Sequence, residues 1–494
     1  MPDDALTSDQ AAQLGRLLDV HPEARELGQR FAASGHELYL VGGTVRDTLL
    51  AGDDPGRLDQ IDLDLATSAP PEETERIVRP WASAVWLIGA EFGTVSCQKE
   101  APGRPPRRIE ITTYRSDSYV PGSRHPEVRY GETIEGDLAR RDLTVNAMAV
   151  ALPTFRFVDP FGGLGDLRRG VLRTPVDPHT SFADDPLRMV RLARFAAVLD
   201  ARPDPAATAA ATAMADELLT VSAERVREEL VKLVCGRSPR RGIELLVDTG
   251  LARHVLPELE DLRDCRDPMH RHKDVYRHTL AVVENVMELE EDGPDLVLRL
   301  AALFHDIGKP ATKEVHPDGQ VTFHHHDVVG ARMTRHRMRA LRFDKRTVTA
   351  VSELVRLHLR FHTYQHGWTD SAVRRYRRDA GDLLERLNTL TRADVTTGNP
   401  RKAERIQRRV DELEQRIVEL REREELEAMR PPVDGNRIMQ HLGIRPGPLV
   451  GEAWNHLLEL RIEHGPMTEE EALAALDAWW AQRTTEAATE GDDG

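Results

Sequence analysis

The chain has 494 residues, 40% of them hydrophobic and 30% charged, with a formal net charge of −16. At roughly 100–200 residues per domain, this length predicts about three or four domains. No apolar run approaches the roughly 18 residues of a membrane span, and the polar N-terminus excludes a secretory signal peptide. We therefore expect a cytoplasmic protein with no membrane partner.

The cysteines and the distribution of charge indicate the cellular compartment and the kinds of partner that the protein could bind. Cys97, Cys235 and Cys265 lie far apart without zinc-ligand spacing, which fits a reducing compartment and excludes a disulfide framework. The acidic net charge counts against nucleic-acid binding, because neutralising phosphates requires Lys and Arg. The arginines are clustered, however, for example in residues 332–346 and 401–409. A basic binding face and ordinary solvated helix faces are both open readings of these clusters.

The first elements surround a pair of glycines. Residues 1–22 are expected to be a flexible tail, followed by a helix over 23–34. A short apolar strand then ends at Gly42 and Gly43, and helical character follows. Free amides at a strand-to-helix turn suit a triphosphate, and a plain glycine turn is the alternative.

Three carboxylates follow on strands. Residues 61–65 alternate with period two, which places Asp62 and Asp64 on one face. Two such carboxylates suit Mg²⁺, which binds through one or two carboxylates and the phosphates of its substrate. Glu110 occupies the polar face of a second strand and is a third candidate, although an exposed polar strand face is the alternative. Strands mixed with helices predict an α+β catalytic unit on a small sheet.

Arginines then cluster with acids. The pattern over residues 137–150 predicts one helix. Its helical spacing groups Arg140, Arg141, Asp142 and Asn146. Arginine binds phosphate oxygens bidentately, whereas a surface salt-bridge cluster is the alternative. A later helix begins at Pro186. It carries a stripe of arginines, Arg188, Arg191 and Arg194, which needs an acidic partner, and a nucleotide would be one.

Five segments match one family in order: LVGGTVRD, IDLDLAT, LARRDLTVNAMA, DPFGGLGDL and DDPLRMVRLARF. Together they resemble the bacterial CCA-adding tRNA nucleotidyltransferases and their poly(A) polymerase relatives in the DNA polymerase beta superfamily. The resemblance implies a nucleotidyltransferase head over residues 23–170 and a helical neck over 171–264. It also implies the activity, which is addition of CMP, CMP and AMP from CTP and ATP to the tRNA 3′ end with release of pyrophosphate.

The same resemblance implies residue roles. Asp62 and Asp64 would hold Mg²⁺, and Glu110 would help to orient the primer 3′-hydroxyl. The nucleotide would be bound by Gly42, Gly43, Arg46, Arg141, Asp142, Asn146, Asp185, Arg188, Arg191 and Arg194. Asp185 and Arg188, three apart on one helix face, align with the family's base-reading pair.

This pair has a chemical rationale. A carboxylate beside a guanidinium matches the amino donor and ring-nitrogen acceptor that cytosine and adenine share, and it does not match uracil or guanine. The alternative is that Asp185 only caps the helix that Pro186 begins.

A second constellation occupies residues 265–400. The order H…HD…H…H…D resembles the HD phosphohydrolase superfamily, in which such residues ligate one or two metals from facing helices. The implied ligands are His278, His305, Asp306 and Asp394, with His326 and His358 available for a second metal. Imidazole plus carboxylate suits Zn²⁺, Mn²⁺, Fe or Ni²⁺.

The remainder is helical. Residues 401–428 carry apolar positions at heptad spacing, which predicts packing on the body or a modest homodimer seam. Residues 401–482 would form a helical body and tail for tRNA, and 483–494 are expected to be disordered. Two rival functions stay open: a poly(A) polymerase with the same head, and an HD-type phosphohydrolase with a nucleotide-sensing head.

Overall fold

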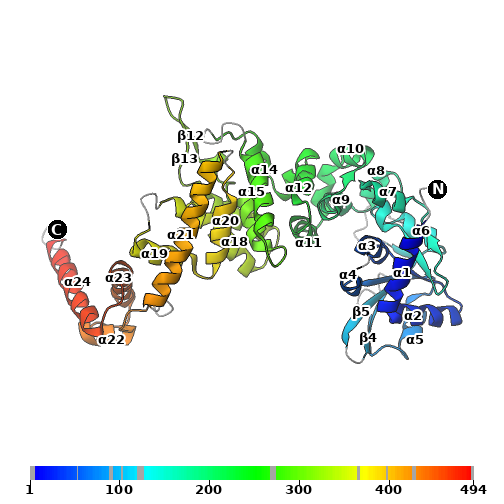
Figure 1. The fold of residues 1–494 in the computed structure, drawn as a ribbon, viewed down its shortest axis with the longest axis horizontal. Coiled ribbons are helices and arrows are strands. Elements are labelled where there is room, and N and C mark those ends of the chain that lie inside the picture. The colour runs from blue at the N-terminus through cyan, green and yellow to red at the C-terminus, as the bar shows by residue number, and fades with distance from the viewer. Residues whose placement is uncertain are drawn as a thin grey trace. The chain divides into compact units, whose positions relative to one another are not determined.

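The computed structural model describes residues 6–52, 54–87, 93–101, 104–118, 127–267, 274–363, 368–396, 399–424 and 430–490. Its contacts divide the chain into two units, Met1–Glu260 and Asp261–Gly494. The first unit contains the main sheet and the second is mostly helical, as expected for an α+β head followed by helical parts (Figure 1). None of the described helices is long and apolar enough to cross a membrane.

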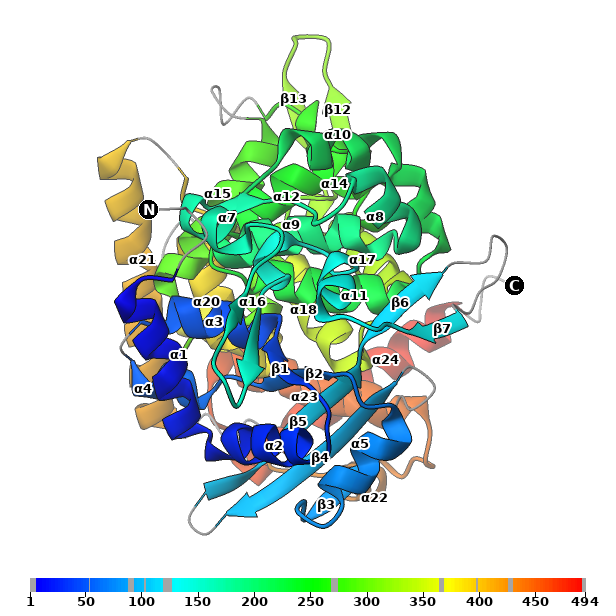
Figure 2. The same cartoon turned by 90° about the vertical axis from the view of Figure 1, so that its right-hand side faces the viewer.

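The first unit is built on a seven-stranded sheet with the order β3-β4-β5-β2-β1-β8-β9 (Figure 2). Its strands are β1 Leu38–Val41, β2 Leu63–Thr67, β3 Ala84–Trp86, β4 Thr94–Ala101, β5 Arg104–Thr113, β8 Ala149–Leu152 and β9 Phe157–Val158. Strands β2 and β5 are parallel, with Asp64 directly opposite Glu110. Because paired residues point to the same face, this register places the two carboxylates side by side.

Alternate residues of each strand enter two cores. Leu38 and Leu40 of β1 join a core beneath helices α1 Ser8–Val20, α2 Pro22–Ala33, α3 Gly43–Ala51 and α5 Pro71–Val78. Tyr39 and Val41 join a second core with α6 Ile134–Ala139. Both faces of the sheet are therefore covered, and the site forms where its central strands end.

The expected flexible tail over residues 1–22 is wrong for its described part, which includes helix α1. Thr7 begins this helix with a capping box: its side chain accepts from the Gln10 amide at 3.2 Å, and the Gln10 side chain accepts from the Thr7 amide at 3.1 Å. Leu17 and Leu18 are buried in the core of the head. Residues 1–5 lie outside the described residues.

The expected single helix over residues 137–150 is also wrong. Helix α6 ends at Ala139, a 3-10 turn spans Thr144–Asn146, and β8 begins at Ala149. The Asp142 carboxylate accepts from the Leu143 amide at 2.8 Å and from the Asn146 side chain at 2.9 Å. Polar side chains thus compete with helical hydrogen bonds, and the chain turns.

The neck is a series of short helices. They follow α7 Gly163–Arg169 and are α8 Pro178–Asp184, α9 Leu187–Leu199, α10 Pro205–Ala213, α11 Ala223–Val234, α12 Pro239–Asp248 and α13 Ala252–Val255. Helix α9 packs against α11 and α12. This packing brings residues of α11 close to the predicted arginine stripe.

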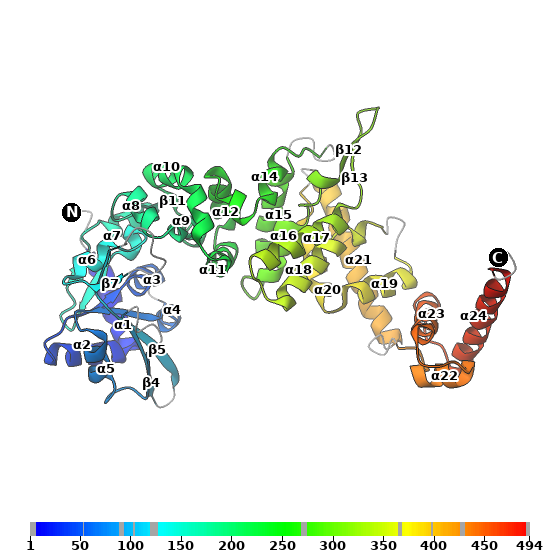
Figure 3. The same cartoon turned by 180° about the vertical axis from the view of Figure 1, so that it is seen from behind.

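The second unit contains the HD block (Figure 3). Its helices are α15 Val275–Leu289, α16 Leu296–Phe304, α17 His326–Ala340, α18 Lys345–Leu357, α19 Asp370–Ala380 and α20 Leu384–Ala393, with a hairpin of β12 Lys313–Val315 and β13 Val321–Phe323. Helix α21 Pro400–Glu424 packs on α19 and α20. Its Val410, Leu413 and Leu420 are buried within the chain, so these residues belong to the body rather than to a free dimer seam.

The C-terminal helices α22 Gly435–Leu442, α23 Pro448–His464 and α24 Glu469–Glu490 share a small core of their own. Ile438, Leu457 and Leu476 contribute to it. Because α24 continues to Glu490, the expectation of disorder from residue 483 is wrong for 483–490. Residues 491–494 lie outside the described residues.

Candidate active site and metal centre

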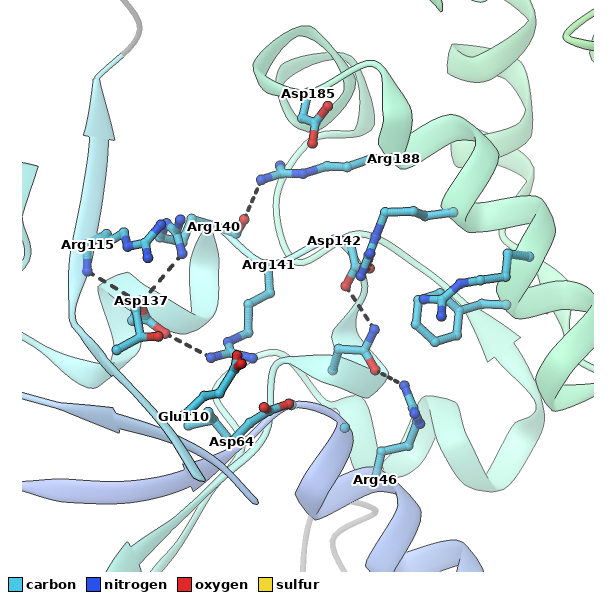
Figure 4. Close-up of a pocket in the computed structure, with 18 of the residues that line it drawn as sticks. Arg46, Asp64, Glu110, Arg115, Asp137, Arg140, Arg141, Asp142, Asp185 and Arg188 are labelled. Atoms are coloured by element: carbon cyan, nitrogen blue, oxygen red, sulfur yellow. Dashed lines mark hydrogen bonds and ion pairs between the residues drawn. The ribbon is translucent and has the colours of Figure 1, made fainter. Parts of the chain in front are cut away.

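A pocket of about 540 Å³ opens in the first unit (Figure 4). Its lining comes from the Gly-Gly turn, strands β2 and β5, the turn after α6, and helices α9 and α11. Asp64, Glu110 and all ten residues expected to bind the nucleotide line it. Asp62 does not line it and instead lies immediately before β2.

Thr44 fixes the start of the acidic strand. This buried residue in the first turn of α3 donates from Oγ1 to the Asp62 carbonyl at 2.7 Å and accepts from the Asp64 amide at 2.8 Å. Desolvation in the pocket raises the pKa of Asp64 to about 6, against the effect of Arg141 and with that of Glu110. The site is therefore a place where a cation would relieve crowded carboxylates.

The head carboxylates fit Mg²⁺ bound together with substrate. Among the described residues, groups of three ligand atoms within 4.8 Å occur in the second unit and not around Asp64. Magnesium usually binds through one or two carboxylates and takes further oxygens from phosphates and water. A site of one or two carboxylates that is completed by nucleotide phosphates is thus compatible with the carboxylates of this pocket.

Gly42 and Arg141 lie against each other. Gly42 has φ +63°, a conformation that favours glycine, and a Cβ at this position would lie 2.5 Å from Nη1 of the Arg141 side chain. Arg141 pairs with the buried Asp137 at 3.2 Å. Figure 4 shows this guanidinium beside Asp64 and Glu110. Asp137 was not among the expected site residues, although its spacing of four from Arg141 was the available signal.

A chain of polar contacts joins the other predicted arginines. Arg46 donates to Asn146 Oδ1 at 2.5 Å, and Asn146 donates to Asp142 at 2.9 Å. Arg191 donates twice to Asp142, at 2.8 and 2.6 Å. This network fixes the turn after α6 to helix α9.

Glu229 of α11 completes the network. This buried carboxylate pairs with Arg191 at 3.3 Å and with Arg194 at 2.9 Å. The arginine stripe thus has acidic partners within the protein, Asp142 and Glu229, where sequence reasoning expected a nucleotide. Glu229 lies far from the stripe in sequence, so no local pattern could indicate it.

Asp142 is the most strongly stabilised carboxylate of this network. Burial would raise its pKa, but Arg191 and Asn146 outweigh burial and lower the pKa to about 2. A carboxyl whose folded-state pKa is depressed contributes stability above its ordinary pKa and loses it as pH falls through the folded-state value. The contribution is therefore present in full from neutral pH down to about pH 5.

We expect Asp142→Asn to lower the free energy of unfolding by on the order of 2 kcal/mol, because Arg191 loses a buried charged partner. Thermal or urea unfolding at pH 7 measures the difference. Asp200→Asn is the matched control, since Asp200 is about half exposed and pairs with Arg241 outside the pocket. Equal losses of stability in Asp142→Asn and Asp200→Asn would contradict the stabilising role of the ion pair between Asp142 and Arg191.

The base-reading candidates make several contacts. Asp185 accepts from the Leu187 amide at 3.2 Å and pairs with Arg225 of α11 at 2.7 Å. Arg188 donates to the carbonyls of Ser181 and Arg140 at 3.1 and 2.6 Å. Asp185 therefore accepts from the first amide of α9, whose N-cap is Pro186, and both Asp185 and Arg188 line the pocket. Arg225 was not expected, because its contact with Asp185 depends on tertiary packing.

The HD residues gather into two groups in the second unit. Each group places three ligand atoms within 4.8 Å of one another: His278, His305 and Asp394 in one, Asp306, His326 and His358 in the other. His305 follows α16, His358 follows α18 and Asp394 follows α20. Gly308 allows the backbone after His305 and Asp306 to approach the start of α17, since a Cβ at this position would lie 2.2 Å from the His326 carbonyl oxygen.

The imidazoles are oriented as metal ligands. Nδ1 of His305, His326 and His358 contacts the carbonyls of residues 302, 323 and 355 at 2.7, 2.8 and 2.6 Å. Such contacts fix the ring and leave Nε2 for a metal. Nε2 of His326 and Nε2 of His358 are buried without a hydrogen bond, whereas Oδ2 of Asp306 lies 2.8 Å from Lys309 Nζ. The two orphaned imidazole nitrogens and the mixed nitrogen and oxygen donors fit a divalent transition metal.

Charge at this centre is tightly coupled. Burial, reinforced by His305, lowers the pKa of His358 to about 4. For His305, burial is outweighed by Asp306 and Asp394, which raise its pKa to about 9. Lys309 contacts Asp306 at 2.8 Å and Asp267 at 2.9 Å. The charged groups of the centre are thus buried and in contact with one another.

Models of known families match three consecutive stretches of the chain. They are the poly(A) polymerase head domain over residues 38–173, a probable RNA and SrmB-binding site of polymerase A over 202–262, and an HD domain over 275–399. The first stretch contains the carboxylates of the head pocket, and the third contains the HD centre.

Solved structures share the fold. They include the Bacillus stearothermophilus CCA-adding enzyme in complex with CTP, with a TM-score of 0.68 and 24% identity over 94% of this chain and 99% of that one. The Thermotoga maritima CCA-adding enzyme complexed with tRNA has a TM-score of 0.57 and 20% identity over 94% of this chain and 98% of that one. At these identities the likeness concerns the fold.

Relatives of higher sequence identity indicate the family to which the chain belongs. The A-adding tRNA nucleotidyltransferase of Deinococcus radiodurans is 35% identical over 72% of this chain and 81% of that protein. The CC-adding tRNA nucleotidyltransferase of Thermus thermophilus is 32% identical over 91% and 95%. The CCA-adding enzyme of Levilactobacillus brevis is 36% identical over 50% and 59%. With the Deinococcus and Thermus proteins matched over most of their length, the chain belongs to the family of bacterial tRNA nucleotidyltransferases.

Proposed function

We propose that this chain adds CMP, CMP and AMP from CTP and ATP to the 3′ end of tRNA, without a nucleic-acid template. The observation that carries the proposal is one pocket that joins Asp64 and Glu110 to all ten expected nucleotide-binding residues. The relatives matched over most of their length are named for tRNA, which favours tRNA over a poly(A) substrate. Their names divide between CC addition and A addition, so the assay must separate the two steps.

The geometry suits positional catalysis. Asp62 and Asp64 would hold Mg²⁺, which when bound supplies charge neutralisation at the α-phosphate. Arg141, beside Gly42 and the carboxylates, would bind phosphate oxygens of the nucleotide. Glu110, opposite Asp64, would orient the primer 3′-hydroxyl. The 3′-oxygen then attacks the α-phosphorus, the bond to the β-phosphate breaks, and pyrophosphate leaves.

Base selection is assigned to Asp185 and Arg188. We expect Asp185→Asn to increase UTP or GTP incorporation and to weaken the use of CTP and ATP, because the amide offers the base a donor where the carboxylate only accepts. A bidentate base contact is worth roughly 1–3 kcal/mol, so selectivity should change by about tenfold to a hundredfold. Arg188→Ala should also lose selectivity. Incorporation of each NTP, measured singly, provides the test.

Capping can be separated from base reading with a second helix. Asp177 caps α8 by accepting from the Thr180 amide at 3.0 Å and lies outside the pocket. Asp177→Asn is therefore the matched control. If Asp185→Asn matches this control in NTP selectivity and differs only in thermal stability, the pair caps a helix and another group reads the base.

A second activity is proposed for the HD centre, because six candidate ligand residues gather there and backbone carbonyls orient three of the imidazoles. The centre would bind one or two Zn²⁺, Mn²⁺, Fe or Ni²⁺ ions and hydrolyse a phosphate ester. On this proposal the head, neck and C-terminal helices serve tRNA in the cytoplasm, and the HD block carries a separate reaction.

A further inference from the structure

The polar face of strands β4 and β5 continues the row of carboxylates beyond the head pocket. Asp64 lies opposite Glu110, and Glu110 lies opposite Ser96 of β4, so these three side chains share one face of the sheet. Arg108 precedes Glu110 by two residues on β5 and therefore points to the same face. The residue between them, Ile109, is buried in the core on the other face. A cation thus stands on the open face of the sheet beside the expected catalytic carboxylate.

Arg108 forms an ion pair with this carboxylate. The side chains of Arg108 and Glu110 lie 3.0 Å apart and are 55% and 44% exposed. Arg108 also donates to the Ser96 hydroxyl at 3.3 Å. An ion pair between two half-exposed side chains is weak, so better partners can replace it. A phosphate is such a partner for a guanidinium, because it accepts two parallel hydrogen bonds.

The nucleotide and the tRNA primer would use different elements of the head. The residues expected to bind the nucleotide lie on the Gly-Gly turn and α3, on the turn after α6, and at or near α9, and none of them lies on β4 or β5. Arg108 does not line the nucleotide pocket, whereas Glu110 does. Residues two apart on a strand are separated by roughly 7 Å, a length comparable to one nucleotide from its 3′-oxygen to its 5′-phosphate. A primer whose 3′-hydroxyl reaches Glu110 can therefore place its last phosphodiester at Arg108.

Arg115, the cation that follows Glu110 along the chain, is held by other groups. Its guanidinium donates to the Thr94 hydroxyl at 3.0 Å, and its amide donates to the buried Asp137 at 3.4 Å. Arg108 is more than half exposed, so its guanidinium can turn toward a bound RNA strand. Of these two arginines, Arg108 is therefore the better candidate for a contact that forms only with the primer.

We propose that Arg108 binds the phosphodiester before the 3′-terminal nucleotide of the tRNA primer, and that it leaves Glu110 for this phosphate when the primer enters. The exchange releases the Glu110 carboxylate, which then accepts a hydrogen bond from the primer 3′-hydroxyl. Arg108 would thus fix the position of the attacking nucleotide and couple its arrival to the release of Glu110. This inference rests on the proposed addition of nucleotides to tRNA.

The test uses the full-length protein, CTP and a tRNA that lacks CCA. One tRNA carries an uncharged methylphosphonate in place of the phosphodiester before its 3′-terminal nucleotide, and another carries the same replacement at its 5′ end. We expect the 3′ replacement to raise the KM of the wild type for tRNA about tenfold, and the 5′ replacement to have no effect. Arg108→Ala should raise the KM for unmodified tRNA by a similar factor and leave the KM for CTP unchanged. The 3′ methylphosphonate should then cost this variant nothing further.

Two further variants serve as controls. Arg108→Lys keeps the positive charge and should recover part of the affinity for tRNA. Arg76 on α5 is 69% exposed, pairs with Glu73 and lies outside the pocket, so Arg76→Ala should behave like the wild type. The unfolding temperature of each variant shows whether the fold is retained.

The kinetic pattern decides whether the contact exists. Losses from Arg108→Ala and from the 3′ methylphosphonate that do not add support it. An equal effect of the methylphosphonate on the wild type and on Arg108→Ala overturns it. A lower kcat of Arg108→Ala with an unchanged KM for tRNA also overturns it, because the arginine would then act on Glu110 alone. Absence of any extension by the wild type refutes the proposed function itself, whereas normal extension with additive losses refutes only the contact at Arg108.

Discussion

Asp64→Ala is expected to abolish nucleotide addition while tRNA binding is retained. The carboxylate lies in the pocket opposite Glu110, where it would hold the ion that neutralises charge at the reacting phosphate. Losing several kcal/mol of transition-state stabilisation corresponds to a rate loss on the order of a thousandfold or more. Primer extension with CTP and a tRNA lacking CCA measures the rate, and a filter-binding or gel-shift titration measures tRNA affinity.

Asp62→Ala should behave in the same way, because residues two apart along a strand share a face and Asp62 would bind the same ion. Glu100→Ala is the control, since Glu100 is exposed on β4 of the same sheet and lies outside the pocket. Near-normal turnover in Asp64→Ala would refute the assignment of the head. A loss of tRNA binding that parallels the loss of activity would show that the carboxylate acts through RNA contacts.

The double substitution His305→Ala/Asp306→Ala is expected to remove bound transition metal and phosphohydrolase activity while nucleotide addition continues. His305 belongs to one ligand group and Asp306 to the other, so the variant damages both. Metal content of the purified protein is measured by elemental analysis, alongside hydrolysis of p-nitrophenyl phosphate and primer extension.

His316→Ala/Asp318→Ala provides the matched control, because these residues lie beside the hairpin strands and belong to neither ligand group. It should retain its metal. Unchanged metal content in the His305/Asp306 variant would mean that the buried cluster is structural.

Local patterns indicated candidate residues that lie together in the structure where these residues belong to short, ordered segments. Strand alternation indicated Asp64 and Glu110, and the register of β2 and β5 places them side by side. The HD residues were visible because His305 and Asp306 are adjacent and follow a helix end. In each case the signal in the sequence was local, although the assembled site joins residues far apart in the chain.

Residues that act through tertiary contacts could not be predicted in this way. Glu229 and Arg225 reach the pocket only because α11 packs against α9. The turn after α6 was read as helix, since its apolar spacing is helical while Asp142 and Asn146 bind each other across the break. Helix α1 is polar overall, so its composition alone does not indicate that Leu17 and Leu18 are buried in the core of the head.

The most direct test of the proposed function is extension of tRNAs that end before, within and after CCA, with each NTP alone and in mixtures. We predict that CTP alone adds two residues to tRNA lacking CCA, that ATP adds one residue to tRNA ending in CC, and that tRNA ending in CCA is not extended. Addition of only C or only A would reduce the activity to one of the two steps. Long runs of A, or no incorporation on any tRNA, would contradict the account.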